Sequence, residues 1–149
     1  MDIPENFLKA IYGQAEREYP AECCGMLLGP RSDKSVISRL RPCRNAQDDF
    51  HTREPERFPR TARTGYFIDP RELMRVYKEA GQEGEEIRII YHSHIDSGAH
   101  FSEEDHRVAA PDGQPAYPGV LYLVLGVKEG QVQETRLFHW DETAQRYNA

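Results

Sequence analysis

The segment GVLYLVLGV, residues 119–127, constrains the fold more than any other part of the chain. It is apolar throughout, whereas a strand with one solvated face alternates apolar and polar residues. We therefore expect a central strand buried on both faces. A second β-rich run, EIRIIYHSH at residues 86–94, ends in two histidines. These strands predict a sheet whose two faces are covered by other elements.

Helices and further strands are indicated by their periodicity. Leu8, Ile11, Tyr12 and Ala15 recur at helical spacing, and Pro20 follows them. Three other segments favour strands: CCGMLLG at 23–29, SVISRL at 35–40 and QVQETRLFHW at 131–140. Residues 41–64 show no periodicity and predict a long loop. The chain therefore mixes strands and helices without strict βαβ repetition.

Two helix starts carry capping signals. GYFIDPRELMRVYKEAGQEG, residues 65–84, predicts a strand that enters a helix capped by Asp69, with Glu72 closing a capping box and Gly81 at its end. SEEDHRVAA, residues 102–110, predicts a helix that begins at Ser102 and stops before Pro111. The expected fold class is α/β (α+β), a mixed β-sheet flanked by helices, in one domain spanning 1–149.

Composition limits the function classes. Apolar residues make up 38% and charged residues 30% of the chain, and the net charge is −6, which argues against a nucleic-acid surface. No run approaches the roughly 20 apolar residues of a membrane span. The N-terminus lacks signal-peptide features, and the three cysteines do not resemble a disulfide framework, so we expect a cytoplasmic protein.

The histidine pair raises the question of a metal. Side chains at i and i+2 of a strand leave the same face, so His92 and His94 can converge on one ion. A catalytic zinc needs a third protein ligand. With Asp96 as that ligand, HSHID resembles the start of the metallo-β-lactamase motif, but Ser97 stands where that motif has another histidine.

Asp105 gives the better match. The series His92, His94, Ser102 and Asp105 has the spacing His-x-His-x7-Ser-x2-Asp, and Glu22 lies upstream before a Gly-containing apolar strand. This arrangement resembles the JAMM (MPN-plus, JAB domain) zinc metalloproteases, most closely the small stand-alone bacterial type. The family commonly has proline where this chain has Ile95, and the Arg-rich segment 53–63 is longer than the usual connector.

The resemblance implies one Zn²⁺ per chain, held by His92, His94 and Asp105. Zinc acidifies its water, Glu22 would act as the general base and Ser102 would stabilise the oxyanion. The implied reaction is hydrolysis of peptide or isopeptide bonds after the C-terminal Gly-Gly of ubiquitin-like or sulfur-carrier proteins. The oligomeric state stays open, with a homodimer as one alternative.

Other interpretations remain beside this one. Metal-free relatives of the family are non-catalytic binding scaffolds, whereas a zinc deaminase would need His-x-Glu and Cys-x-x-Cys, which this chain lacks. His100 and His106 are interpreted as loop histidines without a ligand, and Asp96 as a loop polar residue. Cys23 and Cys24 flank the proposed base and are expected to be buried and reduced.

Overall fold

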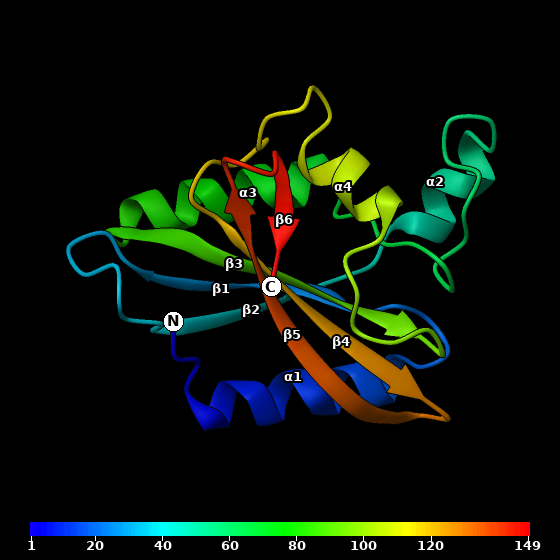
Figure 1. Cartoon of the computed structure of the whole chain (residues 1–149), viewed down its shortest axis with the longest axis horizontal. Coiled ribbons are helices and arrows are strands. Elements are labelled where there is room, and N and C mark those ends of the chain that lie inside the picture. The colour runs from blue at the N-terminus through cyan, green and yellow to red at the C-terminus, as the bar shows by residue number, and fades with distance from the viewer.

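A computed structural model describes residues 1–149. Its elements are α1 (Glu5–Glu18), β1 (Cys24–Pro30), β2 (Arg39–Cys43), α2 (Gln47–Arg53), α3 (Pro70–Gln82), β3 (Glu85–Ile95), α4 (Glu103–Ala109), β4 (Leu121–Lys128), β5 (Gln131–Asp141) and β6 (Arg146–Asn148). The strands form one sheet in the order β2-β1-β3-β4-β5-β6 (Figure 1). Only β3 and β4 pair in parallel, so the sheet is mixed, as predicted.

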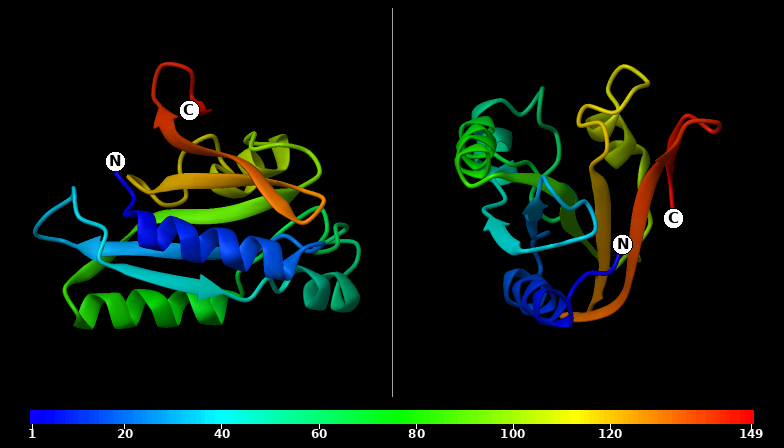
Figure 2. Two further views of the ribbon diagram at one scale, coloured as in Figure 1. Left: turned by 90° about the horizontal axis from the view of Figure 1, so that it is seen from below. Right: turned by 90° about the vertical axis from the view of Figure 1, so that its left-hand side faces the viewer.

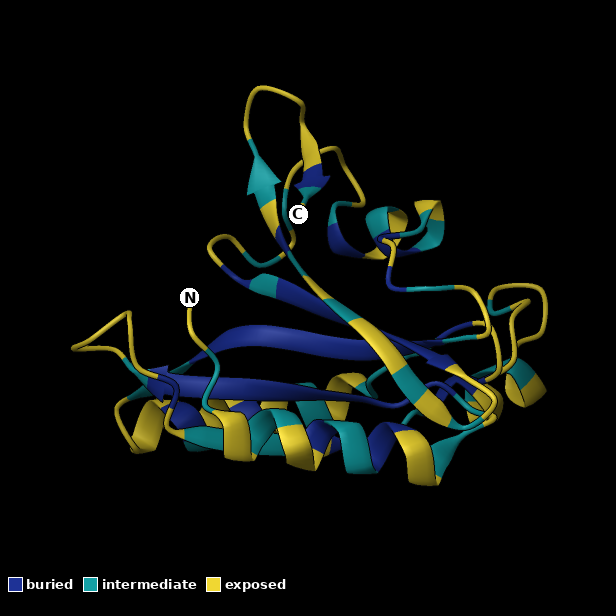
Figure 3. Ribbon diagram, turned by 60° about the horizontal axis from the view of Figure 1, so that its bottom comes forward, coloured by how far each residue is buried: buried dark blue, intermediate teal, exposed yellow.

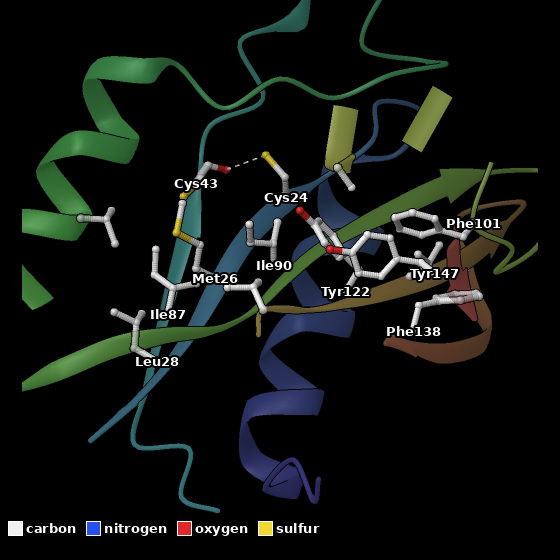
Figure 4. Close-up of a cluster of buried hydrophobic side chains, with 14 of the residues drawn as sticks. Cys24, Met26, Leu28, Cys43, Ile87, Ile90, Phe101, Tyr122, Phe138 and Tyr147 are labelled. Atoms are coloured by element: carbon white, nitrogen blue, oxygen red, sulfur yellow. Dashed lines mark hydrogen bonds between the residues drawn. The ribbon is translucent and has the colours of Figure 1, made fainter. Parts of the chain in front are cut away.

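The sheet is covered on both faces by helices. α1 contacts β4 and β5, and α3 contacts β3. Figure 2 shows the two helices on opposite sides of β1 and β3. β3 is buried along most of its length (Figure 3). Its Ile89 and Tyr91 belong to the core under α1. Ile90 belongs to the core under α3 (Figure 4). Because successive strand residues point to opposite faces, His92 and His94 share the α3 face with Ile90.

The two predicted helix caps are present. The Asp69 side chain accepts a hydrogen bond from the Arg71 backbone N–H, and Pro70 is the first residue of α3. The Glu72 carboxylate pairs with Arg41 and does not close the expected capping box. A complete capping box starts α4, between Ser102 and Asp105. No helix in the structure meets the length and hydropathy that a bilayer crossing requires.

Three predictions are wrong in part. The strand expected at 35–40 lies at Arg39–Cys43, because Asp33 accepts hydrogen bonds from Ser35 and forms a turn there. The expected loop 41–64 contains most of β2 and the helix α2, which packs through Phe50 on Phe58 and Phe67. No strand precedes α3 at 65–69, and β6 was not foreseen.

Candidate metal centre

Strand pairing brings Glu22 next to the histidines. β1 and β3 are antiparallel with Cys24 opposite His92. The Cys23 backbone N–H donates to Ser93 Oγ at 2.8 Å, and the Ser93 N–H donates to the Cys23 carbonyl at 3.1 Å. Ser93 lies between His92 and His94, so these two hydrogen bonds hold Glu22, the residue before Cys23, beside the histidines. This long-range register explains how a glutamate 70 positions upstream of His92 reaches the same site.

Three side chains with donor atoms for a metal converge at the end of β3: His92, His94 and Asp105. The Nε2 atoms of His92 and His94 are 3.2 Å apart. An oxygen of Asp105 lies 3.2 Å from Nε2 of His92, and its other oxygen lies 3.0 Å from Nε2 of His94. The side chains of His92 and His94 are 0% and 6% exposed, so water does not separate them.

This donor set fits a metal ion. Zinc bonds to imidazole nitrogen and carboxylate oxygen of about 2.0–2.1 Å, in tetrahedral geometry, separate neighbouring ligand atoms by roughly 3.3 Å. The separations of 3.0–3.2 Å are close to that value. Burial lowers the pKa of His92, although Asp105 acts in the opposite direction. The lowered pKa favours the neutral imidazole that a metal requires. Two imidazoles and one carboxylate hold divalent ions such as zinc or iron(II) in other proteins, so this donor set fits a divalent metal ion.

Asp105 is held in place by the start of α4. Its backbone N–H donates to Ser102 Oγ at 3.0 Å, and one carboxylate oxygen accepts from the Ser102 N–H at 2.9 Å. Burial alone would raise the pKa of Asp105, but the interactions with His92 and His94 outweigh it and hold that pKa well below its usual range. Asp105 is therefore a fixed carboxylate aimed at the histidine pair.

Glu22 is the second buried carboxyl group of the site. Its backbone N–H donates to the Ala62 carbonyl at 2.7 Å, and its carbonyl accepts from Asn45 Nδ2 at 2.9 Å. One oxygen of Glu22 lies within 4.8 Å of a ring nitrogen of each histidine. Burial, followed by the negative charge of Asp105, raises the pKa of Glu22 to about 9. Glu22 could thus reach the ion or a water beside it.

The histidines have different outer partners. Nδ1 of His94 lies 3.2 Å from the Gly98 carbonyl, so a hydrogen on Nδ1 leaves Nε2 free for a metal. Nδ1 of His92 is buried without a hydrogen-bond partner. The Tyr66 ring stacks on the His92 ring, with centroids 4.3 Å apart and planes 18° apart. Nothing in the sequence indicates a site role for Tyr66, because it lies in the stretch 65–69 that predicts an ordinary strand leading into a helix.

A cavity of about 210 Å³ opens onto the site. Of the predicted site residues, Glu22, His94, Ser102 and Asp105 line it, and His92 lies behind them. Arg60 and Arg63, from the Arg-rich segment 53–63 noted in the sequence, also line the cavity, together with Gln47, Tyr66 and Glu104, which the sequence did not single out. In Figure 1, α2, α4 and the end of β3 lie on this same side of the molecule.

The remaining polar candidates have different surroundings. His100 lines the cavity, and its ring centroid is 4.7 Å from that of His94. His106 is part of α4, and its Nε2 accepts a hydrogen bond from the Tyr147 backbone N–H in β6. Asp96 accepts from the Tyr19 hydroxyl. Cys23 and Cys24 are fully buried, and burial raises the pKa of Cys23 to about 12.

Comparison with known proteins gives relatives along most of the chain. It is 28% identical over 136 residues to the CysO-cysteine peptidase of Mycobacterium tuberculosis, covering 91% of this chain and 80% of the relative. It is also 28% identical over 123 residues to a desampylase of Haloferax volcanii, covering 83% of this chain and 75% of that enzyme. The relatives are thus named as a peptidase and a desampylase.

Solved structures share the fold. A protein from Desulfitobacterium hafniense superposes with a TM-score of 0.67 at 22% identity, over 93% of this chain and 83% of the other. A JAB1/MPN domain protein from Archaeoglobus fulgidus superposes with a TM-score of 0.55 at 16% identity, over 93% and 89% of the two chains. The family model for prokaryotic homologs of the JAB domain matches residues 4–141. The chain therefore belongs to the prokaryotic JAB-domain family.

Proposed function

We propose that this chain is a zinc-dependent hydrolase of peptide or isopeptide bonds that cleaves after the Gly-Gly tail of a ubiquitin-like or sulfur-carrier protein. The observation that carries the proposal is the convergence of His92, His94 and Asp105, whose nitrogen and oxygen atoms contact one another at 3.0–3.2 Å beside the buried Glu22. The relatives named peptidase and desampylase support the reaction class and this kind of substrate.

In this proposal His92, His94 and Asp105 hold one zinc ion per chain. Zinc at this position would act as a Lewis acid toward the scissile carbonyl and lower the pKa of a water toward 7. Asp105 supplies one neutralising charge. The Asp105 carboxylate also accepts a hydrogen bond from the Ser102 backbone N–H, which keeps it oriented toward the histidines.

Glu22 is proposed as the general base. Its carboxyl group lies on the cavity wall, near the histidines, and its backbone is fixed by Ala62 and Asn45. The carboxylate would accept the proton of the attacking water and return it to the leaving amine. Such a role is typically worth about 10²- to 10⁴-fold in rate. Positive charge bound nearby would favour the ionised form that this role requires.

Ser102 is proposed to stabilise the oxyanion. Its Oγ accepts a hydrogen bond from the Asp105 N–H, and its own hydroxyl hydrogen stays free to donate. The side chain lines the same cavity as Glu22. A hydroxyl fixed in this way can donate to the oxygen on which negative charge develops as the carbonyl is attacked.

Cleavage of a carrier protein ending in Gly-Gly-X tests the proposal. We expect Glu22→Gln to lower kcat by about 10²- to 10⁴-fold while the variant retains zinc. Glu18→Gln, at the end of α1, is the matched control and should keep wild-type activity. Chelation should abolish turnover, and zinc should restore it. Wild-type rates from Glu22→Gln or from the chelated protein would refute the mechanism.

Metal content separates this proposal from a non-catalytic scaffold of the same family. The purified protein should carry about one zinc per chain, and His94→Ala should carry far less, because it removes one of three ligands. Well under one zinc per chain in the wild type, together with binding of the carrier protein without cleavage, would favour the scaffold.

A further inference from the structure

The aperiodic segment between α2 and α3 places two arginines in the cavity wall. Arg60 and Arg63 both line the cavity that contains Glu22, His94 and Asp105. Both are exposed, and neither has a carboxylate within ion-pair distance, whereas Arg57 of the same segment pairs with Glu54. The cavity wall therefore carries two guanidinium groups that form no ion pair.

The backbone around these arginines is fixed relative to the site. Ala62, which lies between them, is buried, and its carbonyl accepts from the Glu22 backbone N–H at 2.7 Å. Gln47 Nε2 donates to the Arg60 carbonyl at 2.9 Å. Arg60 Nη1 donates to the Thr64 carbonyl at 2.9 Å. The segment is thus attached directly to the proposed base and to α2, so the two side chains start from defined positions.

The acidic groups of the cavity do not neutralise the arginines. Glu104 is paired with Arg107 at 2.6 Å, and Asp105 contacts the two histidines. Glu22 faces the same cavity but forms no hydrogen bond or ion pair with either guanidinium. The charge of Arg60 only partly offsets the raised pKa of Glu22, and it contributes less than Arg107 to the lowered pKa of Glu104. A guanidinium group presents paired N–H donors that match a carboxylate, so two of them favour an anionic group on the bound substrate.

We propose that Arg60 and Arg63 bind the α-carboxylate of the residue that leaves, so that the preferred substrate ends one residue after the scissile bond. This rests on the proposed hydrolase function. The carboxylate of such a residue lies about 3.5 Å from the scissile nitrogen, one residue along the chain, and so falls in the same cavity. At about 210 Å³ the cavity is smaller than the roughly 300 Å³ of ordinary ligand pockets, which suits a small leaving group.

The same reasoning disfavours large leaving groups. A lysine side chain joined through an isopeptide bond brings no α-carboxylate to this position, and a long C-terminal extension moves the carboxylate several residues away. Both would leave the two arginines unpaired beside the substrate. Arg60 and Arg63 are therefore assigned as specificity-determining residues for short extensions with a free C-terminus.

Matched substrates test the assignment. The carrier protein is prepared with a Gly-Gly-Ala C-terminus as the free acid and as the amide, which differ only in the charge at the end. We expect wild-type kcat/KM to favour the acid by about tenfold or more, since hydrogen bonds to charged groups are strong. The double variant Arg60→Gln/Arg63→Gln should bring the ratio close to one. Arg57→Gln, which removes one positive charge of the same segment outside the cavity, should keep the wild-type ratio.

Binding provides a readout that does not need turnover. The tripeptide Gly-Gly-Ala and its amide are titrated into zinc-loaded Glu22→Gln protein, with and without the Arg60→Gln/Arg63→Gln pair. Tighter binding of the acid that disappears with the two arginines supports the assignment, even if no carrier protein is cleaved and the hydrolase proposal fails. An acid preference that persists without the arginines, or no preference at all, overturns it. Equal cleavage of acid and amide would overturn it while leaving the hydrolase proposal standing.

Discussion

Two buried carboxyl groups, Glu22 and Asp105, face one cavity and have pKa values shifted in opposite directions. The contacts with His92 and His94 keep Asp105 ionised, whereas burial raises the pKa of Glu22 to about 9. Environments that separate two carboxyl groups in this way are typical of sites in which one carries fixed charge and the other moves protons. The ligand and base roles proposed for Asp105 and Glu22 follow this division.

The raised pKa of Glu22 predicts a pH-dependent loss of stability in the metal-free protein. The pKa of Glu22 in the folded protein lies above its ordinary value of 4.5, so the contribution of this group to stability is fully present below about pH 4.5 and is lost as pH rises toward 9. Glu22→Gln removes the titrating group. The free energy of unfolding of the wild type should therefore fall relative to that of Glu22→Gln as the pH rises. We expect the difference between the two proteins to grow in favour of the variant by about 1 kcal/mol or more from pH 5 to pH 8.5.

Urea unfolding in the presence of chelator at the two pH values measures this difference. Glu18→Gln serves as the control and should follow the wild type at both pH values. If the gap between Glu22→Gln and wild type is the same at pH 5 and pH 8.5, then Glu22 does not titrate in this range and its assigned environment is wrong.

At the scale of elements, the loop that leaves β3 is anchored to β5. Glu134 accepts a hydrogen bond from the Ala99 backbone N–H at 2.7 Å, and the neighbouring Gly98 carbonyl faces Nδ1 of His94 at 3.2 Å. A Cβ at Gly98 would lie 2.9 Å from the Glu134 carboxylate, and its φ of +82° suits glycine. One strand thus helps to orient a histidine of another.

Removal of this anchor should weaken metal binding without unfolding the sheet. We expect Glu134→Ala to lower zinc affinity by about three- to tenfold. This is no more than the roughly tenfold or greater loss that follows removal of a group bonded directly to a metal ligand, because Glu134 acts on His94 only through the Gly98 carbonyl. Glu142→Ala, an exposed acid beyond the other end of β5, is the control. Competition with a chromophoric chelator gives the affinities. Equal affinities for the two variants would show that the Gly98 carbonyl is held without Glu134.

Helices and strands whose sequence signals are local could be predicted from the sequence, whereas those that depend on distant residues could not. α1, β3, β4 and α4 were predictable because their apolar periodicity or capping residues are local. α2 was not, since it has seven residues and depends on Phe50 packing against Phe58 and Phe67 from beyond the helix. Spacing along β3 and α4 identified the histidines and Asp105. Arg60, Arg63 and Tyr66 reach the cavity through long-range bonds such as that from Asn45 to Gly65, which no local pattern encodes.

In the whole molecule, the site joins segments that are distant along the chain. Glu22 precedes β1, His92 and His94 end β3, and Asp105 lies in α4. None of these segments binds an ion alone, since each offers at most two ligands. A metal bound at this position therefore recognises the folded arrangement, and its binding free energy adds to the stability of the fold.

Zinc should accordingly raise the thermal midpoint of the whole protein. At a free zinc concentration of 100 times Kd, linkage gives about 2.7 kcal/mol, which corresponds to roughly 5–10 °C for a chain of this size. Differential scanning fluorimetry with and without zinc measures the shift. His94→Ala should show little or no shift because it lacks one ligand, whereas His139→Ala, an exposed histidine on β5, should shift like the wild type. A full shift in His94→Ala would mean that zinc stabilises the protein from another site, and the centre at the end of β3 would lose its assignment.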